Sequence, residues 1–152
     1  MRALLTVSLL ATLACSTPIQ GHKINDNKLN REVVALMEAY RGAMEARDAE
    51  RVLSYVAKDY FEDQGNTNSD DDYGRKALKK RLNERFAQTG VLHMKLKLLE
   101  VLTKDSEIAA RLSFDVRYRF DLPSGSHWER HKDVNEVLLV RRGNSLKIKT
   151  GL

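Results

Sequence analysis

The stretch IAARLSFDVRYRF, residues 108–120, has an apolar side chain at every second position, and from Arg111 onward the positions between are polar. Its apolar members are Ile108, Ala110, Leu112, Phe114, Val116, Tyr118 and Phe120. Successive side chains of a strand point to opposite faces of a sheet, so this pattern predicts a long antiparallel strand that is buried on one face only. The sequence therefore contains at least one strand that must pack against a hydrophobic layer.

Three further strands are predicted around this one. Residues 92–98 alternate apolar residues with His93, Lys95 and Lys97, and a turn at 104–106 follows them. After a turn at 123–126 we expect a strand over 127–141, then a turn at Gly143 and Asn144 and a last strand over 145–150. The four strands follow one another without an intervening helix, which is typical of an antiparallel meander.

Three helices are predicted before the strands. The first covers residues 28–47, where apolar residues recur at spacings of three and four. Asp48 is the expected N-cap of a second helix that ends near Tyr60, and a polar loop over 62–72 leads to a third helix that closes at Gly90. Helices followed by a run of strands indicate an α+β fold.

The first 14 residues have the composition of a secretory signal peptide. Arg2 is followed by an apolar stretch that is too short to span a bilayer, and the chain's single cysteine, Cys15, comes next. This segment resembles the signal of bacterial lipoproteins, in which the cysteine carries the lipid, although Thr12 and Leu13 depart from that pattern. An ordinary secretory signal is the alternative. With a lipid on Cys15, residues 16–27 are expected to be a flexible tether, and the protein is expected in the cell envelope. Ser16 after the cysteine resembles the pattern of lipoproteins sent to the outer membrane.

Composition limits what the remainder can be. Without the signal about 138 of the 152 residues remain, enough for one domain over residues 28–152. A lone cysteine allows no intramolecular disulfide. The formal net charge of +5 arises from 26 basic and 21 acidic residues that are interspersed, so composition alone names no partner.

Residues 28–152 resemble the nuclear transport factor 2-like (NTF2-like) superfamily, also called SnoaL-like or cystatin-like α+β cones. The resemblance rests on the first helix, on the ARDAERVLSYVAKDY stretch at 46–60, on the helix after Gly74 and on the strands that end in LKIKTG at 146–151. It implies three helices packed on a strongly curved sheet of about four antiparallel strands, with a pocket between the two layers. Members of this superfamily include both enzymes and binding proteins, so the resemblance implies a fold and leaves the activity open.

Several residues are candidates for a site in such a pocket. Asp59 lies next to Tyr60 at the end of the second helix and is the best placed carboxylate for a general acid or base. Five aromatic residues could line the pocket or simply pack in the core. They are Tyr40, Tyr55, Tyr60, Tyr118 and Trp128.

No metal or cofactor is expected. Asn66, Asn68 and Asp70 match the first positions of an EF-hand loop, but Ala77 stands where the loop needs Glu. His127 and His131 share a strand face yet lie roughly 13 Å apart at about 3.3 Å per residue, too far for one ion. The basic residues of the third helix lack interleaved aromatic residues, so nucleic acid is not an expected partner.

The sequence favours a binding module over an enzyme. It contains no recognisable nucleophile, metal triad or phosphate-binding loop, so we expect a pocket for a small apolar ligand or a surface for an envelope partner. The alternative is a small isomerase, dehydratase or hydrolase that uses Asp59. Apolar residues at successive positions in 98–102 and 137–140 put apolar side chains on both faces of the sheet, which suggests a homodimer through the outer face.

Overall fold

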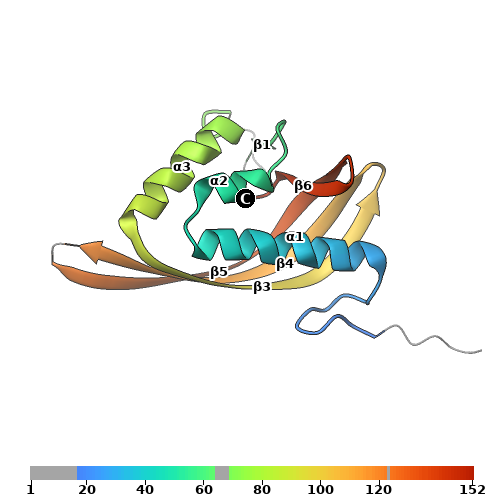
Figure 1. The fold of residues 1–152 in the computed structure, drawn as a ribbon, viewed down its shortest axis with the longest axis horizontal. Helices are drawn as coiled ribbons and strands as arrows, with labels where there is room; N and C mark the ends of the chain where they lie inside the picture. The colour runs from blue at the N-terminus through green and yellow to red at the C-terminus, as the bar shows by residue number, and fades with distance from the viewer. Residues whose placement is uncertain (1–16, 64–68, 123) are drawn as a thin grey trace, which may run out of the picture.

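Four antiparallel strands form a curved sheet, and three helices cover its concave face (Figure 1). The computed structural model describes residues 17–63, 69–122 and 124–152. The elements are α1 (Lys28–Glu45), α2 (Ala49–Ser54), β1 (Phe61–Glu62), β2 (Tyr73–Gly74), α3 (Arg75–Gln88), β3 (Thr89–Lys104), β4 (Glu107–Leu122), β5 (Gly125–Arg142) and β6 (Ser145–Thr150). The predicted α+β fold is confirmed, and the short β1–β2 hairpin is an addition to it.

The alternation in residues 108–120 has the expected consequence for packing. Leu98 pairs with Leu112 across β3 and β4, and Met94 pairs with Val116, so these side chains share the concave face. Val33 of α1 packs into the same core, where Leu98 and Leu112 have no exposed surface. Burial of each such side chain contributes about 1.5–3 kcal/mol, which makes this layer the main source of stability.

Helix α2 is shorter than the sequence predicts. It ends at Ser54 because the backbone that follows is used by the sheet. The Ala57 nitrogen donates to the Ile148 carbonyl at 2.8 Å, and the Ile148 nitrogen donates to the Tyr55 carbonyl at 2.9 Å. The segment after α2 therefore covers the edge of β6, and helical spacing of apolar residues could not reveal this long-range pairing.

Gly90 does not end α3 as predicted. The helix ends at Gln88, and Gly90 lies within β3 at an irregularity between Thr89 and Val91. The side chain of Thr89 donates to the Arg85 carbonyl at 2.8 Å, so the last turn of the helix is closed by a side chain. The helix passes directly into the strand.

Residues 17–27 differ from the expected flexible tether. They fold back on themselves and pack against the edge of β3, where Ile24 is buried. The Lys23 nitrogen donates to the Leu98 carbonyl at 2.8 Å, and the Leu98 nitrogen donates to His22 Nδ1 at 3.1 Å. An edge strand exposes backbone groups that need partners, and this segment supplies them.

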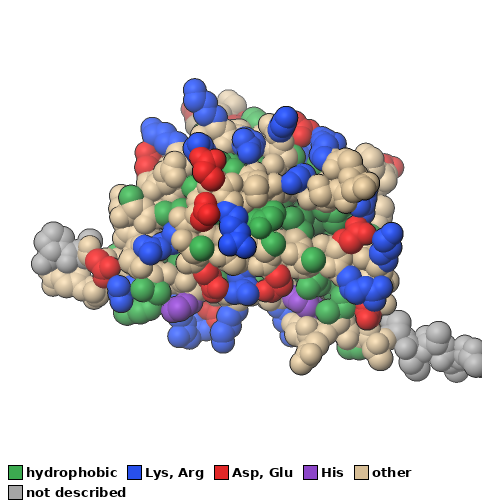
Figure 2. Space-filling view, viewed as in Figure 1, with side chains coloured by type: hydrophobic (Ala, Val, Ile, Leu, Met, Phe, Trp, Pro, Cys, Tyr) green, Lys and Arg blue, Asp and Glu red, His purple; other side chains and the backbone are tan. Residues whose placement is uncertain are grey.

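The outer face of the sheet is dominated by charge. Lys95, Asp115 and Lys132 are consecutive partners across β3, β4 and β5 on this face, and basic side chains are seen along the lower side of the molecule in Figure 2. Asp115 is held by Arg130 through two hydrogen bonds of 2.7 and 2.5 Å. Leu102, Ala109 and Leu138 are also consecutive partners on this face, with Leu102 exposed and the other two half-buried, so an apolar row crosses the sheet beside the charged one.

Candidate functional site

A cavity of about 120 Å³ lies between the helices and the concave face of the sheet. Side chains of α1, α3, β3, β4 and β5 line it, together with the residues that follow β6. We call it the cone cavity. Its lining residues are Tyr40, Met44, Arg85, Met94, Phe114, Val116, Tyr118, His131, Asp133, Asn135, Gly151 and Leu152.

The floor of the cone cavity is apolar and comes from two layers. Tyr40 and Met44 lie four residues apart on α1, so they project from the same side of the helix. Phe114 and Val116 project from the alternating face of β4, opposite Leu96 and Met94 of β3. Thioether and aromatic side chains adapt to the shape of an apolar ligand and can also orient it.

Tyr40 keeps its proton in this setting. Burial raises the pKa of its phenol well above the usual range, the phenol of Tyr118 raises it further, and the positive charge of Arg85 opposes part of that rise. The Tyr40 hydroxyl is therefore a neutral hydrogen-bond donor and acceptor at the wall of the cavity.

The β5 wall is polar because the helices do not cover this part of the strand. His131, Asp133 and Asn135 alternate along β5 on the concave face and all remain exposed. His131 Nε2 lies 3.8 Å from Asp133 Oδ2, which is close enough for an ion pair when the imidazole is protonated but too long for a hydrogen bond. This wall can supply polar contacts to a bound molecule.

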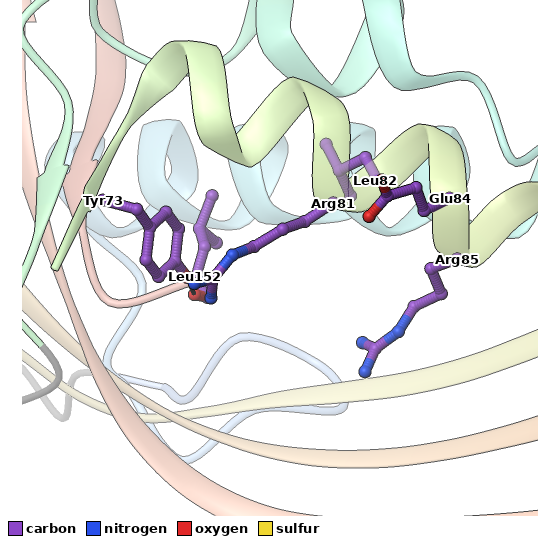
Figure 3. A pocket seen from close by; sticks show the side chains of 6 residues that line it. All are labelled: Tyr73, Arg81, Leu82, Glu84, Arg85 and Leu152. Carbon is purple, nitrogen blue, oxygen red and sulfur yellow. Dashed lines mark hydrogen bonds between the residues drawn. The ribbon is translucent and has the colours of Figure 1, made fainter. Parts of the chain in front are cut away.

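Helix α3 supplies two arginines to a cavity beside the cone cavity. Arg81 and Arg85 lie one helical turn apart on α3, and Arg81 extends toward Tyr73 and Leu152 while Arg85 extends toward the strands (Figure 3). They line an adjoining cavity of about 420 Å³ together with Tyr73, Leu82, Glu84 and Leu152. The two cavities share Arg85 and Leu152, so they lie next to each other.

The end of the cone cavity near β6 is closed by Gly151 and Leu152. The buried carboxylate of Glu62 accepts hydrogen bonds from their backbone nitrogens at 2.6 and 3.2 Å and from the Thr150 hydroxyl at 3.2 Å. The Tyr73 hydroxyl donates to the Leu152 carbonyl at 2.8 Å. The β1–β2 hairpin thus fixes two of the residues that shape the cavity.

The five aromatic candidates divide into two groups. Tyr40 and Tyr118 line the cone cavity, whereas Tyr60 is buried beside Glu62 and Tyr55 hydrogen-bonds with Arg51 Nε at 3.5 Å outside it. Trp128 lies on the outer face instead of in a pocket, with 51% of its surface exposed.

The placement of Trp128 has a simple physical reason. Along β5, Trp128 is an odd number of residues from His131, so the two side chains must point to opposite faces. On the outer face its ring stacks with His93, with ring centroids 6.4 Å apart and planes 9° apart.

Asp59 does not face the cone cavity. Its side chain is 53% exposed, and Arg142 Nη2 lies 2.7 Å from its Oδ2. A backbone hydrogen bond at Asp59 itself lowers the pKa of this carboxylate most, and Arg142 lowers it further. A lowered pKa beside an arginine is the opposite of the raised value that a buried general base would need. The geometry therefore gives the enzymatic hypothesis based on Asp59 no support.

Two other expectations concern the N-terminus and metals. Cys15 and the signal segment lie outside the described residues, as do Asn66 and Asn68. Within 17–63, 69–122 and 124–152, no group of three or more His, Cys, Asp or Glu residues is arranged to hold a metal ion. None of the helices in those ranges is long and apolar enough to cross a bilayer.

Sequence reasoning missed Arg81, Arg85 and Glu62. The two arginines do carry a local signal, because each lies three residues after a buried leucine, Leu78 or Leu82, and so borders the apolar stripe of α3. Glu62 carries none, because the backbone nitrogens that it binds, those of Gly151 and Leu152, are 89 and 90 residues away in the sequence.

Comparison of the structure with solved proteins shows what this architecture is similar to. A conserved protein from Planctomyces limnophilus superimposes with a TM-score of 0.67 at 9% identity over 80% of this chain and 91% of that one. A candidate scytalone dehydratase from Novosphingobium aromaticivorans gives 0.67 at 13% identity, covering 81% of this chain and 80% of that one. A candidate dehydratase of the NTF2-like family from Streptomyces avermitilis gives 0.66 at 14% identity, covering 80% and 92%.

The chain has the NTF2-like fold. No protein-family model matches the sequence, and no curated protein matches it. At these levels of identity the structural likeness concerns the fold alone, so the chemistry must be argued from the cavity.

Proposed function

We propose that this domain is a binding module that holds a small ligand with an apolar body in the cone cavity. The observation that carries the proposal is the composition of the cavity wall, where Met44, Met94, Phe114 and Val116 surround one space and the charged and amide side chains are confined to β5 and Arg85. Ligand sites are commonly concave, mostly apolar and supplied with a few oriented polar groups, and this cavity has each of those properties.

The placement of polar groups supports binding with a fixed orientation. The protonated phenol of Tyr40 lies at the wall, and Asn135 of β5 offers an amide at the margin. A ligand with one apolar and one polar end could therefore bury the first against Phe114 and keep the second toward the opening.

The proposal includes export and a lipid on Cys15. It is supported by the signal-like segment 1–14 and by the single cysteine that follows it. Metabolic labelling with a fatty-acid probe tests this part. We expect label on the wild-type chain and none on Cys15→Ala, and an unlabelled wild-type chain that is also absent from the membrane fraction would contradict it.

Binding to the cone cavity is tested by titrating the full-length chain with 4-phenylbutan-1-ol in a calorimeter. We expect saturable binding, and we expect Val116→Phe to remove it because the larger ring fills the cavity. Val134→Phe on the exposed outer face is the matched control and should bind like the wild type. Circular dichroism confirms that both variants fold. Equal binding by Val116→Phe and wild type would contradict the use of this cavity.

A second candidate function is a lyase or isomerase that uses His131 as its base. The supporting observation is the imidazole of His131 at the margin of the cone cavity beside the carboxylate of Asp133, 3.8 Å away. Incubation of the wild type and His131→Gln with any acid or alcohol that binds, followed by mass spectrometry, separates the two functions. Conversion by the wild type alone supports the enzyme, and unchanged ligand in both samples supports the binding module.

A further inference from the structure

Arg81 and Arg85 lack the carboxylate partners that the fold gives to many of its other arginines. Six arginines have a carboxylate oxygen within 4.0 Å: Arg31, Arg41, Arg119, Arg130, Arg141 and Arg142. In the described part of the chain, neither Arg81 nor Arg85 makes a hydrogen bond or an ion pair. Two positive charges that line one cavity repel each other, so their shared placement needs a different explanation.

Each guanidinium is instead held over an aromatic ring. The Arg81 guanidinium carbon lies 3.9 Å from the centre of the Tyr73 ring, and that of Arg85 lies 5.5 Å from the centre of the Tyr118 ring. Stacking on a ring uses the face of a guanidinium and leaves its N–H groups free along the edge. Both arginines are therefore oriented while their donors stay available.

The supporting rings are themselves fixed. The Tyr73 hydroxyl donates to the Leu152 carbonyl at 2.8 Å, and Tyr118 is half-buried on the concave face of β4. Figure 3 shows Arg81 reaching toward Tyr73 and Leu152 and Arg85 reaching toward the strands, while the Glu84 carboxylate stays beside the helix. Glu84 lies 3.8 Å from Lys80 Nζ, so its charge is partly balanced away from the two arginines.

We propose that Arg81 and Arg85 together bind the carboxylate of an organic acid whose apolar body occupies the cone cavity. The inference rests on the proposed use of that cavity and adds the chemical class of the ligand. A guanidinium edge matches a carboxylate with two parallel hydrogen bonds, and the apolar floor accounts for the rest of the molecule. The site selects a carboxylic acid over a neutral molecule of the same shape.

The test compares two probes of equal shape. The full-length chain is titrated with 4-phenylbutyrate and with 4-phenylbutan-1-ol, in the wild type and in Arg81→Gln, Arg85→Gln and the double variant. Lys80→Gln on the same helix is the matched control, because its side chain is highly exposed and outside the lining of both cavities. Circular dichroism and thermal unfolding confirm that each variant folds.

We expect the wild type to bind the acid at least about tenfold more tightly than the alcohol, since hydrogen bonds between two charged groups are the stronger class. Each single variant should lose part of this preference and the double variant all of it, with the affinity for the alcohol unchanged. Added salt should weaken binding of the acid alone.

Four results would overturn the inference. Equal affinity for acid and alcohol in the wild type removes the role of the arginines while leaving the cavity as a binding site. If the double variant still binds the acid more tightly than the alcohol, residues other than the two arginines bind the carboxylate. Binding of neither probe contradicts both the inference and the proposed function. 4-Phenylbutyl phosphate is titrated as a third probe. Tighter binding of this phosphate than of 4-phenylbutyrate would contradict a carboxylic acid as the ligand class.

Discussion

The carboxylate of Glu62 accepts a hydrogen bond of 2.6 Å from the backbone nitrogen of Gly151. This contact joins the β1–β2 hairpin to the end of β6, where Gly151 and Leu152 line the cone cavity. A buried carboxylate that receives several donors is costly to lose, because each abandoned donor remains desolvated. Glu62 is therefore a positioning residue for the cavity, although it does not line that space itself.

We predict that Glu62→Ala lowers the free energy of unfolding by about 1–3 kcal/mol, since it strands the nitrogens of Gly151 and Leu152. Urea denaturation followed by circular dichroism measures the change. Glu84→Ala is the control, because Glu84 is exposed and 3.8 Å from Lys80, and it should change stability by less than about 0.5 kcal/mol. Equal effects of the two variants would show that the Glu62 contacts contribute nothing particular.

Gly151→Ala should be more destabilising than Gly143→Ala. Both glycines have positive φ, 97° and 58°, which costs a residue with a side chain about 1 kcal/mol. A Cβ at Gly151 would also lie 2.3 Å from the Glu136 carbonyl oxygen and 2.9 Å from the Val137 Cα, whereas one at Gly143 meets nothing within 4 Å. Thermal unfolding of both variants separates the effect of the clash from that of the backbone conformation. Equal losses of stability would contradict a clash between the added Cβ at Gly151 and the backbone of Glu136 and Val137.

Stability at low pH should depend on the ion pair between Asp115 and Arg130. Hydrogen bonding to Arg130 is the largest effect and lowers the pKa of Asp115 to about 2, against about 3.9 in an unfolded chain. Since the folded pKa is the lower one, the contribution is present above about pH 4 and is lost as the pH falls toward 2. Denaturant unfolding at several values in that window measures it.

The matched variants are Asp115→Asn and Arg130→Gln, which remove either partner of the same pair. Both should make stability less dependent on pH between about 4 and 2 than in the wild type. If both variants lose stability with falling pH as steeply as the wild type, other carboxylates cause the acid sensitivity.

The expected homodimer through the outer face is tested with Trp128, the chain's only tryptophan. Its ring is half-exposed on that face, so dimerisation there should reduce quenching of its fluorescence by acrylamide as protein concentration rises. Val134→Glu, which adds a charge to the same face, should restore quenching. Sedimentation as a monomer up to high micromolar concentration would contradict the dimer.

The sequence alone was sufficient for the layers of this fold. Period-two alternation over 108–120 predicted which face of β4 packs on the helices. A shift of the strand by one residue would turn all of these apolar side chains to the solvent face. The stripe that includes Val33 and Met37 likewise predicted the buried face of α1. Both are local patterns, in which the period of the backbone decides which side chains are neighbours.

Only the tertiary structure decided which polar residues meet at the cavity. Asp59 and Trp128 looked suitable by residue type, yet a surface arginine holds the first and strand parity puts the second on the outer face. Arg85 meets Tyr118, and Glu62 meets Gly151, across long stretches of sequence. The first contact depends on how α3 lies against β4, and the second on how the β1–β2 hairpin lies against the end of β6. Local periodicity therefore determined the layers of this protein, whereas the distances between distant segments determined its site.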